Sequence, residues 1–202
     1  MKERGMIFNA EMVRAILDGR KTQTRRTVKP QPDEDGLAKV TNGPWVDTSE
    51  RNYRCPFGDV GDRIWVRETW AEAGASAPNL KLYRANYPEH VPSHYENVPP
   101  ANEIRWTPSI HMPRWASRIL LEITDVRVEC LNSIHDVDAM REGIQNLTTC
   151  SHADFGIPGV VNAQHPVRAF QLLWESIYGA DSWKFNPWVW VIEFKVVNCG
   201  GD

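Results

Sequence analysis

The stretch GRKTQTRR, residues 19–26, is the part of this sequence that says most about the fold. It contains three arginines, one lysine and two threonines. The residues before it, 10–18, predict a short helix, because their apolar side chains recur on one helical face: Met12, Val13, Ile16 and Leu17. Asn9 can cap this helix, and Gly19 stands where a glycine commonly ends one. The basic stretch is therefore expected to begin at a helix exit.

The overall charge and the local charge of the chain point to different partners. A net charge of −3 over 202 residues gives no global basic field of the kind that binds duplex DNA non-specifically. Residues 20–29, however, carry five basic side chains and no acidic one. This pattern favours a small cationic pocket for one anionic group or nucleotide. Most of the nine tryptophans are expected in the core, and a few could stack on a base.

Several classes of protein are disfavoured by composition. The sequence has no run of about 18 apolar residues, so we expect no membrane-spanning helix. The polar N-terminus leads into a strand-like Met6–Phe8 without the apolar core of a signal peptide, which favours a cytoplasmic location. The four cysteines have no C-x-x-C spacing and are expected to be free thiols: Cys55, Cys130, Cys150 and Cys199. We expect neither a zinc site nor a cofactor.

The remaining chain predicts a mixed α+β domain. Residues 63–67 alternate, with Ile64 and Val66 on one face, as expected of a strand entered through a tight turn. The other predicted elements are, in chain order, a strand at 5–9, a strand-like piece at 80–85, a long strand at 117–131 bent near Asp125, a helix at 136–144, a helix from 166 to Gly179, and a strand at 188–197. Residues 71–116 and 145–163 are expected to be largely irregular.

Three of these segments together resemble a known family. They are G-x-K-x-x-T-x-R at residues 19–26, G-D-x-I-W-V-R-E at residues 61–68, and the closing strand at 190–194. The combination resembles the ASCH domain, a branch of the PUA-like superfamily, in its prophage version. The resemblance implies a small PUA-like β-barrel flanked by short helices, with a cleft that faces RNA or a modified nucleoside. It implies one domain over 1–202, with its core at about 5–28, 58–70, 117–144 and 186–197, and insertions at about 29–57, 71–116 and 145–185.

The enzymatic members of this family imply a specific site. Bacterial N4-acetylcytidine amidohydrolases release acetate from the modified base with a lysine, a threonine and a glutamate. These carry over to Lys21, Thr24 and, by its place at the end of the short helix, Glu142. The substrate-binding candidates around them are Arg20, Thr22, Arg26, Trp65 and Glu68. The resemblance therefore implies a hydrolase acting on an N4-acetylcytidine-like nucleoside, without a metal or cofactor.

The chemistry of amide hydrolysis fits these residue types. Thr24 is a candidate nucleophile, which needs a neighbour to accept its proton. Lys21 can accept it only if its pKa falls well below about 10.4, and neighbouring arginines together with enclosure act in that direction. Glu142 can orient the base or relay a proton to the leaving amine. Arg26 can anchor a phosphate or a pyrimidine carbonyl.

Other interpretations of the same residues stay open. Lys21 and Thr24 would point to opposite faces of a regular strand, so a turn or bulge between them is required. Glu68 is either a second cleft carboxylate or the partner of Arg63 or Arg67. The site could also belong to a non-catalytic reader of RNA or a modified base, or to a ribonuclease. We predict that Lys21→Ala abolishes turnover and leaves folding intact, because an exposed or cleft-edge lysine contributes little to the core. The sequence predicts no oligomeric state.

Overall fold

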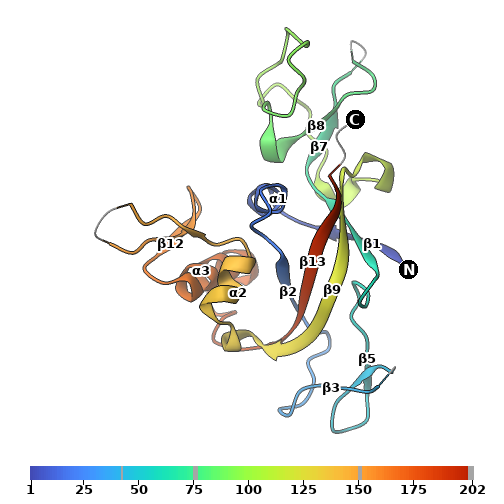
Figure 1. Cartoon of the computed structure of the whole chain (residues 1–202), viewed down its shortest axis with the longest axis vertical. Helices are drawn as coiled ribbons and strands as arrows, with labels where there is room; N and C mark the ends of the chain where they lie inside the picture. The colour runs from blue at the N-terminus through green and yellow to red at the C-terminus, as the bar shows by residue number, and fades with distance from the viewer. Residues whose placement is uncertain (42, 75–76, 150–151, 200–202) are drawn as a thin grey trace.

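The computed structural model describes residues 1–41, 43–74, 77–149 and 152–199 (Figure 1). Its centre is a five-stranded sheet with the strand order β1-β6-β9-β13-β2. Strands β1 (Glu3–Ile7) and β6 (Arg63–Arg67) pair in parallel, and the other pairs are antiparallel. The edge strands β1 and β2 (Gln23–Thr27) are joined through helix α1 (Ala10–Leu17).

Two long antiparallel strands, β9 (Ile119–Cys130) and β13 (Trp188–Cys199), form the spine of the sheet. The bulge predicted near Asp125 is confirmed. Glu193 pairs with Asp125 and the next residue, Phe194, pairs with Ile123, so one residue of β9 is skipped. Such a bulge bends the strand and increases its twist.

The helices follow the predicted pattern of apolar residues. The Asn9 side chain accepts a hydrogen bond from the Met12 N–H (2.8 Å) and caps α1. Helix α2 (Asp136–Arg141) ends at Glu142. Helix α3 (Pro166–Tyr178) buries Phe170, Leu173 and Trp174, which join the main hydrophobic core under the sheet. Figure 1 places α2 and α3 on the β2 side of the sheet.

Three small sheets decorate this core. The first consists of β3 (Ala38–Lys39), β4 (Trp45–Val46) and β5 (Asn52–Tyr53), and the second of β7 (Trp70–Glu72) and β8 (Lys81–Tyr83). The third consists of β10 (Gln145–Asn146), β11 (Phe155–Ile157) and β12 (Val161–Ala163). The segment 145–163 was predicted as a loop without strands, and its three strands were missed because strands of two or three residues are too short to show alternation.

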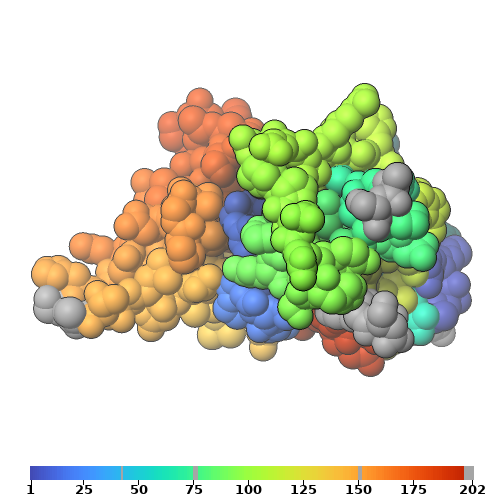
Figure 2. All heavy atoms as spheres, turned by 90° about the horizontal axis from the view of Figure 1, so that it is seen from above, coloured from blue at the N-terminus to red at the C-terminus, as the bar shows by residue number. Residues whose placement is uncertain are grey.

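The 71–116 segment has its own small core, formed by Trp70, Tyr83, Met112 and Ala116. Seen from above, this segment (green) and the region of α2 and α3 (yellow-orange to orange) form separate lobes, and N-terminal residues (blue) surface between them (Figure 2). The basic stretch therefore belongs to a part of the chain that lies between two elaborations of the sheet.

The α+β class is confirmed, whereas a closed barrel is not. None of the sheets in the described part of the chain closes on itself, because β1 and β2 form no strand pairing with each other. The two edges do meet at one point, where the Arg26 Nη2 donates to the Ile7 carbonyl (2.9 Å). None of the described helices has the length and apolar character needed to cross a membrane.

Candidate active site

The turn that follows α1 places Lys21 outside strand β2. Gly19 adopts a positive φ of 71°, and the backbone N–H groups of Arg20 and Lys21 both donate to the Ala15 carbonyl (2.9 Å each). Strand β2 begins only at Gln23. The alternation of side chains in a strand therefore does not apply between Lys21 and Thr24, and both side chains are buried.

Lys21 forms a buried ion pair with Glu142. Its Nζ donates to the Glu142 carboxylate (Oε2, 2.7 Å), to the Glu142 carbonyl (2.8 Å) and to the Gln23 carbonyl (2.8 Å). The two side chains are 0% and 3% exposed. Gly143, with φ 108°, lets α2 end close to α1, since a Cβ there would lie only 3.2 Å from the Ala15 side chain. This close approach positions Glu142 against Lys21.

Burial lowers the pKa of Lys21 from its ordinary value of 10.5. Glu142 acts in the opposite direction, and the positive charges of Arg26 and Arg25 add to the lowering. The expectation of a lysine at the edge of the cleft was wrong: the side chain is enclosed and all three N–H donors of its ammonium are used. Removing it must therefore affect folding.

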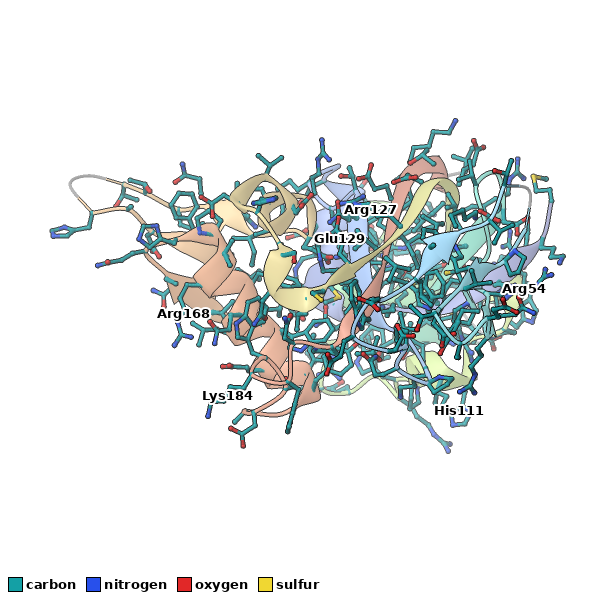
Figure 3. The ribbon with its side chains drawn as sticks, turned by 90° about the horizontal axis from the view of Figure 1, so that it is seen from below. Arg54, His111, Arg127, Glu129, Arg168 and Lys184 are labelled. Carbon is teal, nitrogen blue, oxygen red and sulfur yellow. The ribbon has the colours of Figure 1, made fainter. Side chains whose placement is uncertain are left out.

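Arg25 is a part of this site that the sequence did not reveal as buried. Its guanidinium is fully buried and lies 3.3 Å from the Glu142 Oε1, 3.3 Å from the Glu129 Oε2 and 3.4 Å from the Asp138 Oδ2. Arg127, on β9, also contacts these acids, because it pairs with Glu129. Figure 3 labels the two residues side by side. The acids come from distant segments, so no local pattern marks Arg25 as their partner.

A narrow cavity lies at the free edge of β2, where α3 covers the strand. It is lined by Thr24, Arg25 and Glu142 from one side and by Phe170, Leu173 and Trp174 from α3. Its volume of about 10 Å³ has room for one water molecule. The Nε of Arg25 and the Nε1 of Trp174 are buried without a hydrogen-bond partner in the part of the chain that the structure describes. Two unused donors thus belong to residues that line a cavity beside Glu142.

A larger open cleft of about 480 Å³ lies between the edges of β1 and β2. It shares four lining residues with the narrow cavity: Met12, Arg26, Ile177 and Tyr178. We call this hollow the seam cleft. Apolar surface is exposed around it on three side chains: Ile7 (44%), Ile177 (45%) and Tyr178 (39%). Large exposed apolar side chains around one hollow are typical of a binding site. Arg26 and Arg67 supply its positive charge.

The other predicted substrate-binding residues are spread around this region. Arg20 is half-buried and donates to Asp18 (2.7 Å) and to the Gly143 carbonyl (3.2 Å). Thr22 is exposed, and its backbone N–H donates to the Arg141 carbonyl (2.9 Å). Trp65 is half-buried, with the Arg67 guanidinium 5.4 Å from its ring centroid. Arg26, which is also a predicted substrate-binding residue, lines both the narrow cavity and the seam cleft.

Glu68 lies apart from the cavity and the cleft. It is buried and pairs with Arg118 through two contacts of 2.9 and 3.0 Å, not with Arg63 or Arg67. Burial raises the pKa of Glu68, and Arg118 opposes that shift. Arg118 also stacks on Tyr83, at 4.0 Å from the ring centroid, so this pair ties the sheet to the 71–116 segment.

Metal ligation finds no support among the described residues, which contain no suitable group of His, Cys, Asp or Glu side chains. Cys55 and Cys130 are free thiols, as predicted. The side chains of Cys150 and Cys199 lie outside the described part of the structure.

Comparison with known proteins assigns no family. No protein-family model and no curated protein matches the chain. Among solved structures it is similar to the crystal structure of protein EF3133 from Enterococcus faecalis V583, of family model DUF984, at 9% identity and a TM-score of 0.42. That match covers 100% of this chain and 84% of the other. A likeness this weak assigns neither a family nor an activity.

Proposed function

We propose that this protein is a hydrolase that removes an acyl group from the exocyclic amine of a modified pyrimidine nucleoside such as N4-acetylcytidine. One observation carries the proposal: Lys21 and Glu142, 121 residues apart, form a buried ion pair, and Glu142 shares a cavity with Thr24. An amine, a carboxylate and a hydroxyl in one enclosed site are the groups that amide hydrolysis needs. The ASCH-like motif supplies the substrate class.

The seam cleft is the part of the site that can hold a nucleoside. Its volume of about 480 Å³ falls in the range of small-molecule pockets, about 300–1,000 Å³. The narrow cavity is far too small for more than one water or one substrate oxygen. The base would therefore lie in the seam cleft near Arg26. The acyl group would reach Thr24 once Ile177 and Tyr178, at the end of α3, move aside.

The reaction would proceed through an acyl-threonine. The Thr24 oxygen bonds to the acyl carbon while its proton passes through the Glu142 carboxylate to the unprotonated Lys21 amine. The C–N bond then breaks, and the proton leaves with the amine of the base. A water molecule finally hydrolyses the ester and releases a carboxylate. Burial favours this role of Lys21, because it lowers the pKa of the side chain.

The two unpartnered donors have a role in the same scheme. As the carbonyl becomes tetrahedral, its oxygen gains negative charge and needs hydrogen bonds. The Trp174 Nε1–H and the Arg25 Nε–H are buried, unpaired, and belong to residues of the cavity wall. We assign them to this oxygen, with Arg25 adding positive charge.

The same proposal includes the fold family and the cellular location of the protein. We regard the five-stranded sheet as a PUA-like barrel left open between β1 and β2, where Arg26 bridges to Ile7. We also place the enzyme in the cytoplasm, the compartment in which RNA-derived nucleosides arise.

The test is incubation of the purified protein with N4-acetylcytidine, followed by chromatography for cytidine and acetate. Cytidine and acetate should appear in equal amounts with the wild type. Thr24→Val, which replaces the hydroxyl with a methyl group of similar size, should reduce their formation at least about 100-fold. Absence of both products with the folded wild type would contradict the proposal.

One observation favours the non-catalytic reader as a second candidate. The Lys21 ammonium makes three hydrogen bonds, as a purely structural buried ion pair would. In that case the seam cleft would bind N4-acetylcytidine or RNA without turnover. Binding measured by calorimetry together with unchanged ligand would support the reader, and shortened RNA with intact bases would support a ribonuclease.

A further inference from the structure

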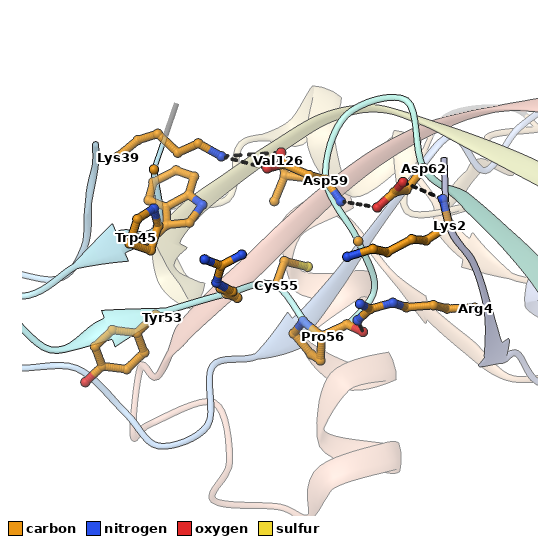
Figure 4. A pocket seen from close by; sticks show the side chains of 14 residues that line it. Lys2, Arg4, Lys39, Trp45, Tyr53, Cys55, Pro56, Asp59, Asp62 and Val126 are labelled. Carbon is orange, nitrogen blue, oxygen red and sulfur yellow. Dashed lines mark hydrogen bonds and ion pairs between the residues drawn. The ribbon is translucent and has the colours of Figure 1, made fainter. Parts of the chain in front are cut away.

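A second hollow, which shares no lining residue with the seam cleft or the narrow cavity, gathers basic side chains from three segments. It is lined by Lys2 just before β1, Arg4 of β1, Lys39 of β3 and Arg54 beyond β5, around a volume of about 190 Å³. We call these four residues and the space between them the basic pocket. Figure 4 shows Lys2, just before β1, and Arg4, within it, extending toward the hollow, with Lys39 and Trp45 on the opposite wall. None of these residues lines the seam cleft or the narrow cavity.

Two carboxylates, Asp59 and Asp62, line the basic pocket against its four cations and leave it with a net positive charge. Asp59 pairs with Lys39 at 3.3 Å. Asp62 accepts the backbone N–H groups of Lys2 (2.7 Å) and Asp59 (3.3 Å). Within the described ranges, no carboxylate forms an ion pair with the side chains of Lys2, Arg4 or Arg54. Arg4 donates instead to the Pro56 carbonyl, which carries no charge.

The remaining wall adds no negative charge and is held in place. Burial raises the pKa of the Cys55 thiol to about 11, so the thiol stays neutral at pH 7. Trp45 packs edge-on against the core residue Trp190, at 5.7 Å between ring centroids, and Tyr53 donates to Asp47 (2.8 Å). The cations are therefore presented by a fixed frame, which lowers the entropy lost when a ligand binds.

The basic pocket also continues into a wider hollow. This second space extends along Val60 and Asp125 and shares six lining residues with the basic pocket: Lys39, Gly43, Trp45, Arg54, Asp59 and Val126. A bare anion would fill only the smaller space. A phosphate attached to a larger group could use both, and Trp45, at the junction, is the residue type on which a base stacks.

We propose that the basic pocket binds the phosphate of a nucleotide or of single-stranded RNA. The proposal is independent of the hydrolase function, because it concerns binding at residues that take no part in that reaction. Lys2 and Arg54 are the cations that hold the phosphate most directly, since each is exposed and has no ion-pair partner within the described ranges. Their ligand adds negative charge beyond that of Asp59 and Asp62, the two carboxylates in the lining.

The experiment is calorimetric titration of the full chain with three probes: inorganic phosphate, cytidine 5′-monophosphate and a six-nucleotide single-stranded RNA. The test variant is Lys2→Gln/Arg54→Gln. The matched control is Arg168→Gln/Lys184→Gln, which removes the same charge on the far side of the molecule (Figure 3). We expect the test variant to bind the nucleotide and the RNA at least tenfold more weakly, and the control less than twofold. For RNA binding, the slope of log K against log salt concentration should be shallower by about 1.4 in the test variant, because two phosphate contacts are lost.

Several outcomes would overturn the proposal. If both double variants bound the nucleotide and the RNA more weakly by the same factor, binding would depend only on the overall charge of the protein. Phosphate binding as tightly as the nucleotide and the RNA would mean that the pocket holds a bare anion. Absence of binding of all three probes by the wild type would also contradict it. Tighter binding of RNA than of the nucleotide would identify a strand as the ligand, and equal binding would identify the nucleotide. The double variant should release cytidine from phosphate-free N4-acetylcytidine at the wild-type rate.

Discussion

The Lys21 ammonium lies 2.7 Å from the Glu142 carboxylate in the interior of the protein, where both side chains are almost fully enclosed. Buried ion pairs are weak evidence for stability, because apolar residues of similar volume often stabilise a fold as well or better. A chemical role offers a reason to keep this one. Arg25, on the other Glu142 oxygen, makes the arrangement a charged triad that only the folded chain can assemble.

The first prediction concerns the stability of this ion pair. Lys21→Met should lower the free energy of unfolding by about 3 kcal/mol, the lower end for breaking a buried pair, because Arg25 still compensates Glu142. Lys21→Met/Glu142→Gln should cost less than the sum of the two single variants. Urea unfolding of the four proteins measures both effects. Additive losses would mean that the two side chains do not interact.

The second prediction concerns pH. The pKa of Lys21 is lowered in the folded state, so between that value and 10.5 only the unfolded chain holds the proton. The contribution of this residue to the free energy of unfolding therefore rises with pH in that window. Between pH 7 and pH 10, the free energy of unfolding of the wild type should increase relative to that of Lys21→Met. The value of kcat/KM should also rise with pH, with an apparent pKa below 10.5. A stability difference that shrinks with rising pH would reverse the sign we assign.

The third prediction separates the role of Trp174 from packing. Trp174→Phe removes a buried donor that has no partner, so it should lower kcat on N4-acetylcytidine about 100-fold while changing stability little. Trp70→Phe is the matched control, because the Trp70 Nε1 is also buried and unpartnered but lies in the small core of the 71–116 segment. Equal effects of the two changes on kcat would remove Trp174 from the mechanism.

The fourth prediction assigns Glu68 to structure. Glu68→Gln leaves Arg118 nearly buried with a weakened partner, and breaking such a pair costs roughly 3–5 kcal/mol. The thermal midpoint should therefore fall, while kcat/KM at a temperature where the variant is folded stays within about twofold of the wild type. Thermal unfolding followed by turnover at low temperature tests this. A selective loss of turnover would return Glu68 to the substrate site.

The fifth prediction concerns the seam cleft. Arg26→Met removes the positive charge that both hollows share and the hydrogen bond to the Ile7 carbonyl. We expect KM for N4-acetylcytidine to rise about tenfold, with a smaller change in kcat, because Arg26 binds the base and not the reacting bond. Arg168→Met, an exposed arginine on α3, serves as the control. A fall in kcat without a change in KM would place Arg26 at the reacting centre instead.

The fold was predictable where a pattern extends over many residues. Helix α1 with its Asn9 cap, the alternating strand β6 and the long strands β9 and β13 all follow from periodicity and turn residues. The three-stranded sheet within 145–163 was missed, because its strands are too short to alternate. The open edge between β1 and β2 depends on strand pairing, which no local pattern specifies.

The site was predictable in part. Lys21, Thr24 and Glu142 are candidates predicted through the family resemblance, and only the tertiary structure shows that Glu142 contacts Lys21. A run of basic residues indicates a solvated surface, so the burial of Lys21 was missed. Trp174 belongs to an apolar stripe and indicates packing alone. Its unpaired donor is visible only when its neighbours in space are known.

The most direct test of the catalytic assignment is the rate of cytidine release from N4-acetylcytidine by four folded proteins: the wild type, Lys21→Met, Thr24→Val and Glu142→Gln. We expect steady release by the wild type and at least about a 100-fold loss in each variant, under conditions where circular dichroism shows that the variant is folded. Release by Lys21→Met at the wild-type rate, or no release by the wild type, would contradict it.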